Sequence, residues 1–343
     1  TTNSTGTRNT AIGQGALTAN TTADNNTAVG KNSMVANTEG HSNVAVGANA
    51  LDANTTGDNN TAIGMDALTA NTTANQNTAV GDEALKLNTT GDCNTAVGKG
   101  SLDTNTTGTR NVAVGGEALG ANTTASFNNA LGYKALCSNT TGASNVSIGT
   151  CSMRINTTGA NNVAVGDKAL CANTTASNNT AVGNAALCLN TTGTDNIAMG
   201  SCTLDANTTG NSNTAIGRLS LTANTTGSNN SAVGAGSLLT NTTGDSNVAF
   251  GVSSLRLNTT GDFNTGIGLC SIYTNTTGGC NSALGNDSLR ANTTGSENTT
   301  VGSASMLLNT TGASNAAMGR SALRNNTTGA NNVAVGKDSL KTN

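Results

Sequence analysis

Apolar and polar positions recur along the whole chain at a fixed spacing of seventeen residues. Gly13, Gly30 and Gly47 begin a series that continues without insertion or deletion to Gly336. Numbered from the Asn four residues before each of these glycines, positions 1 to 17 have the consensus N-T-A-V-G-x-x-A-L-x-x-N-T-T-G-x-x. A period this regular predicts stacked structural units rather than one globular core.

Each repeat contains two short segments that end in Gly or Asn turn signals, such as 27–29 and 50–53. Neither is long enough for a helix, so both are predicted to be strands. Because side chains alternate in a strand, the natural inward positions are position 4, which is always apolar, and position 9, which is Leu, Met or Ile. The predicted core residues are Val29, Val46, Ile63, Val80, Leu51, Leu68 and Leu85.

The predicted fold is therefore all-β, a parallel β-solenoid or β-roll of about twenty coils that forms one continuous domain over residues 1–343. The chain starts and stops in mid-repeat without an atypical repeat at either end. Since repeat arrays normally carry caps, we expect an excerpt of a longer solenoid. Bare ends of this kind also suggest end-to-end assembly into a filament.

The charged residues support the division into inward and outward positions. All of them except Glu39 lie at positions 6, 7, 10, 16 and 17, as expected if a buried unpaired charge is costly. With no Pro or Trp, 1% aromatic residues and 43 Gly, the chain can fill only a narrow core. The 15 Lys and Arg form no basic run, which argues against a nucleic-acid partner, and no apolar stretch is long enough for a membrane span.

Two positions are Asn in every repeat. A turn residue would sometimes be replaced by Gly, Asp or Ser, so stacked amides bonded from coil to coil are favoured over isolated turns. The predicted ladder residues are Asn9, Asn26, Asn43 and Asn60 at position 1, and Asn20, Asn54, Asn71 and Asn88 at position 12.

The run Asn161-Asn162-Val163-Ala164-Val165-Gly166 resembles the N-S-V-A-I-G motif of head repeats in trimeric autotransporter adhesins, and similar repeats occur in phage tail fibres. Every repeat carries a variant of it, although these repeats are longer because of the added N-T-T-G turn. The resemblance implies a left-handed parallel β-roll, a homotrimer, and an extracellular, cell-surface or virion location.

Self-association also has support within the sequence. Position 3 is Ala in seventeen repeats, so both faces of the first segment are uncharged. Strands covered on both faces have this character, and we expect a lateral contact between copies along an Ala stripe. Its first members are Ala28, Ala45, Ala62 and Ala79.

Catalysis and cofactor binding are not expected. His41 is the only histidine, and Asp82 and Glu83 form the only adjacent acidic pair, so no nucleophile, base and orienting group are brought together. Asp58, Asp92, Asp245 and Asp262 recur too irregularly for a calcium ion in every coil. No metal or cofactor is predicted.

The sequence contains candidate residues for two covalent modifications. Cys171 and Cys188 share a position in consecutive repeats, about 4.8 Å apart and within disulfide reach, although in-register side chains point alike and would strain the bond. The N-T-T motif matches the glycosylation sequon at Asn20, Asn54 and Asn88. Glycans on adjacent coils would be crowded, so the structural role of these Asn residues is favoured.

The predicted function is that of a structural extracellular fibre or adhesin stalk that associates with itself. The alternative is a fibre module that binds surface glycans or matrix protein through the variable turn positions. Ice binding by stacked Thr residues is a less favoured alternative, because adjacent Thr side chains point to opposite sides.

Overall fold

The computed structural model describes residues 3–342, and this part of the chain is an all-β parallel solenoid without helices. The fold predicted from the repeat is thereby confirmed. The chain divides into two compact units, Thr1–Ala176 and Ser177–Asn343. The seventeen-residue period runs through both, and one continuous domain over 1–343 stays a prediction.

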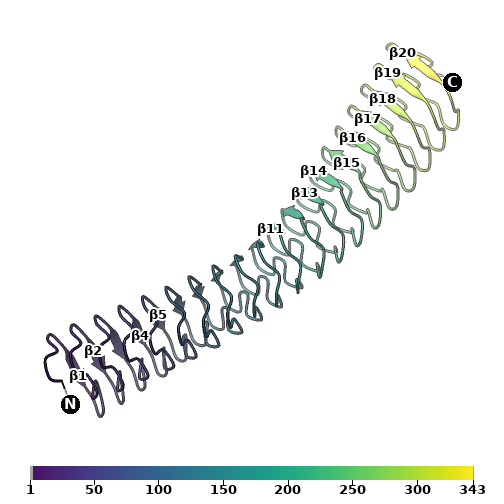
Figure 1. The fold of residues 1–343 in the computed structure, drawn as a ribbon. Helices are drawn as coiled ribbons and strands as arrows, with labels where there is room; N and C mark the ends of the chain where they lie inside the picture. Colours follow the sequence, from purple (N-terminus) through teal and green to yellow (C-terminus); the bar gives the residue numbers. More distant parts are fainter. Residues whose placement is uncertain (1–2, 343) are drawn as a thin grey trace. The chain divides into compact units, whose positions relative to one another are not determined.

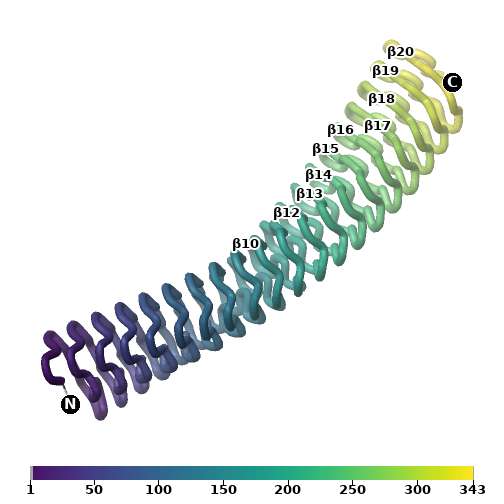
Figure 2. Tube along the Cα trace, viewed as in Figure 1, coloured from purple at the N-terminus to yellow at the C-terminus, as the bar shows by residue number. Residues whose placement is uncertain are grey.

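Each coil contributes one strand of three residues, and within each unit the coils are stacked (Figures 1 and 2). The strands of the first unit are β1 (Thr10–Ile12), β2 (Thr27–Val29), β3 (Val44–Val46), β4 (Thr61–Ile63), β5 (Thr78–Val80), β6 (Thr95–Val97), β7 (Val112–Val114), β8 (Asn129–Leu131), β9 (Val146–Ile148) and β10 (Val163–Val165). Those of the second unit are β11 (Thr180–Val182), β12 (Ile197–Met199), β13 (Thr214–Ile216), β14 (Ser231–Val233), β15 (Val248–Phe250), β16 (Thr265–Ile267), β17 (Ser282–Leu284), β18 (Thr299–Val301), β19 (Ala316–Met318) and β20 (Val333–Val335).

Strands within a unit pair in parallel and in register. In β2 and β3, for example, Ala28 lies opposite Ala45 and Val29 opposite Val46. Each strand residue therefore lies beside the residue that occupies the same repeat position in the next coil. Side chains of the same repeat position are stacked along the sheet, as the fixed period requires.

The second predicted strand is wrong. Residues 50–53 form turns, and Leu51 has a φ of 53°, which lies outside the β region. The alternation of polar and apolar residues arises here because the backbone turns, not because it is a pleated strand. The turns are still bonded to the next coil, since Leu51 N donates to Ala67 O at 2.9 Å.

Left-handed backbone recurs at positions 7, 9 and 17 of the coil. In one stretch these positions are Glu83, Leu85 and Cys93, with φ values of 59°, 50° and 60°. Such a conformation costs a non-glycine residue about 1–2 kcal/mol. It is held by bonds to adjacent coils, for instance from Glu83 N to Met65 O and from Leu85 N to Ser101 O, each 3.0 Å. The stack therefore imposes a backbone that an isolated coil would not adopt.

Position 5 is always Gly for two separate reasons. Gly132 has a φ of 140°, in a region nearly closed to other residues. A Cβ added to it would lie 2.5 Å from the carbonyl oxygen of Gly149 in the next coil. Both the conformation and the close approach of the coils thus exclude any side chain.

The core differs from the predicted one at the strand. Leu51, Leu68 and Leu85 at position 9 are fully buried, as predicted, but the inward strand residue is the Ala of position 3. Ala28, Ala45, Ala62 and Ala79 are fully buried and form no surface stripe. Val29, Val46 and Val80 are half-buried and Ile63 is 40% exposed, so the predicted inward role of position 4 is wrong.

The volume of the coil explains this reversal. The interior already holds the Leu of position 9 and two Asn side chains, and it leaves space opposite for little more than a methyl group. Gly266 replaces Ala at position 3, and a Cβ there would lie 2.7 Å from Ser254 Oγ and 3.4 Å from Leu255 Cγ. Side chains larger than Ala are therefore disfavoured at position 3, where Thr300 is the one branched residue.

Two hydroxyl residues at position 3 have buried partners. Ser147 Oγ lies 2.6 Å from Ser152 Oγ, and Thr300 Oγ1 lies 2.7 Å from Ser288 Oγ. Both partners occupy position 8, which is Ala in nine coils and Ser or Thr in the others. A buried hydroxyl is costly without a hydrogen bond, and the second hydroxyl removes that cost.

Candidate functional site

The Asn residues of position 12 form a ladder through the interior. Asn54 Nδ2 donates to Asn37 Oδ1 at 2.8 Å and to Gly57 O at 3.0 Å. Asn71 Nδ2 in turn donates to Asn54 Oδ1 at 2.9 Å. The same bonds to the preceding coil occur at Asn20 and Asn88. The predicted ladder is confirmed at this position.

The Asn residues of position 1 also connect the coils, but through the backbone. Asn43 N donates to Asn26 Oδ1 at 2.9 Å, and Asn60 N donates to Asn43 Oδ1 at 2.8 Å. Asn9 Oδ1 accepts from Asn26 N in the same way. Asn43 Nδ2 crosses its own coil to Gly57 O at 2.8 Å. One carbonyl oxygen therefore accepts from both Asn residues of its coil, which braces the coil internally.

The glycosylation sequons are buried within this ladder. Asn20, Asn54 and Asn88 are fully buried, and each Nδ2 donates both to the preceding Asn and to a carbonyl oxygen three residues ahead. Attachment of a glycan would replace one of the two Nδ2 hydrogens, so one of these bonds would be lost and the sugar would have to enter the buried interior. The contacts support the structural role of these residues and argue against modification of the folded chain.

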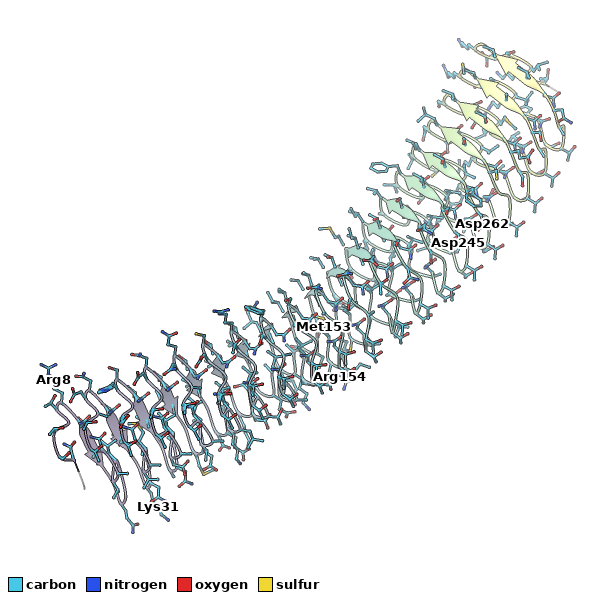
Figure 3. All side chains as sticks on the ribbon, viewed as in Figure 1. Arg8, Lys31, Met153, Arg154, Asp245 and Asp262 are labelled. Carbon is cyan, nitrogen blue, oxygen red and sulfur yellow. The ribbon has the colours of Figure 1, made fainter. Side chains whose placement is uncertain are left out.

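Acidic and polar residues at position 16 have a structural role that the sequence did not reveal. Asp245 Oδ1 accepts from Ser228 N at 2.6 Å, and Asp262 Oδ1 accepts from Asp245 N at 2.7 Å (Figure 3). His41 Nδ1 accepts from Asp24 N at 2.9 Å in the equivalent place. Side chains with an acceptor can thus replace one another here, which explains their irregular recurrence.

The cysteines lie at outward positions and are half-buried or exposed. Cys171 belongs to the first unit and Cys188 to the second, and both are half-buried. A disulfide between them stays a prediction. Charged side chains also point outward, as Figure 3 shows for Arg8 and Lys31, whereas Met153 at position 9 is fully buried.

The outer face of the sheet in each unit is the candidate assembly surface. It consists of positions 2 and 4, which are mainly Thr, Val and Ile and include no charged residue. Position 4 is well exposed in several coils, with Ile63 at 40%, Phe250 at 55% and Met318 at 54%. Since the strands are in register, the apolar side chains form a continuous stripe within each unit. Soluble monomers rarely expose such a stripe.

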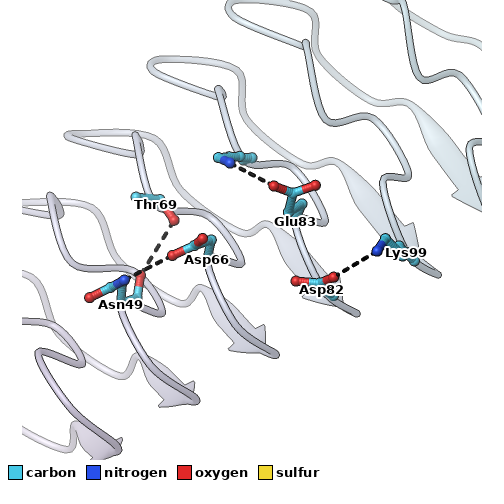
Figure 4. A network of polar contacts seen from close by, with 7 residues as sticks. Asn49, Asp66, Thr69, Asp82, Glu83 and Lys99 are labelled. Carbon is cyan, nitrogen blue, oxygen red and sulfur yellow. Dashed lines mark hydrogen bonds and ion pairs between the residues drawn. The ribbon is translucent and has the colours of Figure 1, made fainter.

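A second surface lies at the edge formed by positions 6, 7 and 10. In the first unit it carries polar contacts within and between neighbouring coils (Figure 4). Asn49 Nδ2 donates to Asp66 Oδ1 at 2.9 Å, and Lys99 Nζ lies 3.2 Å from Asp82 Oδ2. These side chains are partly exposed, so such pairs contribute little to stability and leave the edge free to vary.

Three Asp residues at position 10 are held at this edge in a partly buried environment. Burial raises the pKa of Asp52, Asp103 and Asp205 above the ordinary value. Hydrogen bonds from backbone N–H groups lower the pKa, but their effect is smaller than that of burial. In Asp205, the Oδ1 atom is buried without a hydrogen-bond partner. Ionisation of this carboxyl therefore disfavours the folded state.

Asp205→Asn should raise the melting temperature at pH 7 and leave it nearly unchanged at pH 3. A raised pKa means that the folded state holds its proton more tightly, so stability falls as pH rises through the folded pKa of Asp205 and is flat below the unfolded value. Calorimetry at the two pH values measures this difference. Asp195→Asn, an exposed change in the preceding coil, is the control. An equal gain at both pH values would contradict the assignment.

Between residues 3 and 342 no helix is long and apolar enough to cross a bilayer. Within the same described part of the chain, no group of three or more His, Cys, Asp or Glu side chains is arranged to hold a metal ion.

Comparison with known proteins returns no matching family model and no matching curated protein. The likeness to adhesin head repeats therefore remains an expectation from the N-x-V-A-V-G motif.

Proposed function

We propose that this chain is a structural β-solenoid that associates with copies of itself and acts as an extracellular fibre or stalk. The observation that carries the proposal is the exposed, uncharged stripe of positions 2 and 4 on a scaffold whose buried polar groups bond from coil to coil. In such a scaffold each coil is bonded to its neighbours by the same contacts, so the stack can extend over many coils. The cell-surface or virion location rests on the resemblance to adhesin and tail-fibre repeats.

A second copy is the partner that best fits the stripe. Its apolar side chains recur once per coil, at about the 4.8 Å spacing of neighbouring strands. Another copy presents the same side chains at the same spacing, so the match can extend over many coils. A trimer, as in the resembling adhesins, would cover the stripe of each chain.

Charges placed on the stripe should dissociate the assembly. In the triple variant Ile63→Glu/Val97→Glu/Ile148→Glu, carboxylates would be buried at the contact, and a buried unpaired charge is strongly unfavourable. We expect sedimentation equilibrium to give the mass of a single chain for this variant and a multiple of it for the parent. Far-ultraviolet circular dichroism should be unchanged, because the three side chains point outward.

The matched control is Gln14→Glu/Thr150→Glu/Ser201→Glu, which adds the same charge at exposed residues of position 6. It should keep the parent's mass. A parent chain that sediments as a monomer, or a control that dissociates as much as the stripe variant, would refute lateral association through this face.

Ice binding receives no support from the Thr residues of position 13. Thr21 Oγ1 donates to Thr38 O and Thr55 Oγ1 to Thr72 O, each at 3.1 Å. These hydroxyls are partly buried and bonded to the next coil, so they do not form a free planar array.

A further inference from the structure

The edge of positions 6, 7 and 10 is interrupted in the first unit by a notch of about 570 Å³. Three glycines create it: Gly100 at position 7, Gly116 at position 6 and Gly120 at position 10. Equivalent positions in other coils carry Asp66, Met65 or similar side chains. The notch is thus a space that three missing side chains leave open within an otherwise regular edge, and its volume is typical of small-molecule sites.

An aromatic ring forms one wall of the notch. A Cβ added to Gly116 would lie 3.6 Å from Cδ2 and 3.8 Å from Cε2 of Tyr133, so the ring borders the bare backbone of the preceding coil. Tyr133 is 52% exposed. Part of the ring is therefore open to a ligand.

The carboxylate of Asp103 borders the notch beside the backbone of Gly120. Asp103 Oδ1 is 3.5 Å from where a Cβ of Gly120 would be. No ion pair with Lys or Arg involves Asp103 in the part of the chain that the structure describes. Its carboxylate can accept further hydrogen bonds from a ligand.

The other charges at the notch are compensated. Glu83 pairs with Lys86 at 2.7 Å, and Glu117 Oε2 lies 3.4 Å from the Nζ of Lys134. Lys99, which also lines the notch, pairs with Asp82. The lining includes three carboxylates and Lys99, and the uncompensated carboxylate of Asp103 would repel an anionic ligand. The notch therefore favours a ligand that carries no negative charge and has hydroxyl donors.

We propose that this notch binds a neutral saccharide. A pyranose ring has an apolar C–H face, which would pack on the Tyr133 ring, and a rim of hydroxyls, which would donate to the carboxylates of Asp103 and Glu117. Hydrogen bonds to ionised acceptors are stronger than neutral ones. The inference does not depend on self-association, because the notch and the stripe are formed by different positions of the coil.

Tyrosine fluorescence provides a direct measurement. The chain has no Trp and only two Tyr residues, Tyr133 and Tyr273, so Tyr273→Phe leaves Tyr133 as the only reporter. We expect a saturable change in its emission when this variant of the full chain is titrated with neutral oligosaccharides, using trisaccharides of glucose, galactose and N-acetylglucosamine as probes. Choline and inorganic phosphate serve as cationic and anionic comparisons.

Two further substitutions in that background locate the site. Asp103→Asn should weaken binding about tenfold or more, because it removes an ionised acceptor. Gly116→Met should abolish binding by filling the notch, and folding should persist because Met65 has the same position in another coil. Asp52→Asn, at the position of Asp103 in a coil outside the notch, should leave the affinity unchanged.

The proposal is overturned if none of the trisaccharides changes the fluorescence at concentrations of tens of millimolar. It is equally overturned if the change persists in Gly116→Met, or if choline or phosphate binds more tightly than every saccharide. Circular dichroism of each variant confirms that a loss of binding does not reflect unfolding.

Discussion

Leu119→Asp is expected to unfold its own coil and the adjacent ones, with a loss of more than about 4 kcal/mol. Leu119 is fully buried at position 9, where a carboxylate would have no partner and would leave a cavity as well. Its φ is 52°, a conformation that Asp adopts more readily than Leu. The backbone therefore favours the substitution, and the whole loss comes from the core.

Hydrogen exchange followed by mass spectrometry on the full chain measures this effect. Protection should fall around residues 102–136 and persist in distant coils of the same unit, because each coil contacts only its neighbours. Glu117→Ala is the control, since Glu117 is exposed and makes only a surface ion pair. If the two variants exchange alike, position 9 is not the core.

Asn292→Ala should cost about 3 kcal/mol or more, an unusually large effect for a polar residue. Asn292 Nδ2 donates to Asn275 Oδ1 and to Gly295 O, and its Oδ1 accepts from Asn309 Nδ2, each at 2.8 Å. The substitution leaves Asn275 Oδ1 and one amide hydrogen of Asn309 buried without a partner. Chemical denaturation of the full chain, with exchange at residues 275–312, measures the loss.

The control for this variant is Asn286→Ala in the same coil. Asn286 is exposed at position 6 and donates only to the side chain of Asp287, so the change should be within about 0.5 kcal/mol of zero. Equal losses at Asn286 and Asn292 would mean that the ladder contributes nothing beyond an ordinary surface amide.

The stacked architecture follows from the sequence because the period fixes it. Within a unit, each residue lies beside the residue at the same repeat position in the next coil. The pairing of Ala28 with Ala45 in β2 and β3 is the direct result. The invariant Asn residues were predictable for the same reason. Only a side chain that bonds to its own copy, as Asn54 does to Asn37, would resist replacement so uniformly.

The inward side of the strand could not be predicted from charge or hydrophobicity. Neither position 3 nor position 4 carries a charge, so the test that separated buried from exposed positions could not distinguish them. Hydrophobicity favoured the larger residue, but space in the narrow coil decided for Ala. The left-handed backbone at Leu51 was hidden too, because nothing in a Leu side chain indicates a positive φ.

The notch was missed because it consists of absent side chains. Gly100, Gly116 and Gly120 lie at three variable positions, where a single glycine carries no signal by itself. Their proximity appears only when positions 6, 7 and 10 of adjacent coils are known to share an edge. Three glycines within about twenty residues of variable turn sequence were the available signal.

The close approach of Gly132 to Gly149 has a consequence for how a gene of this kind can change. Within each unit the coils meet through the same backbone contacts, so one coil can replace another there without loss of fit. Recombination that removes or duplicates whole repeats would preserve each such junction, whereas a shift by any other number of codons would place a side chain against a carbonyl oxygen. We therefore expect related chains to differ in length by complete coils of seventeen residues.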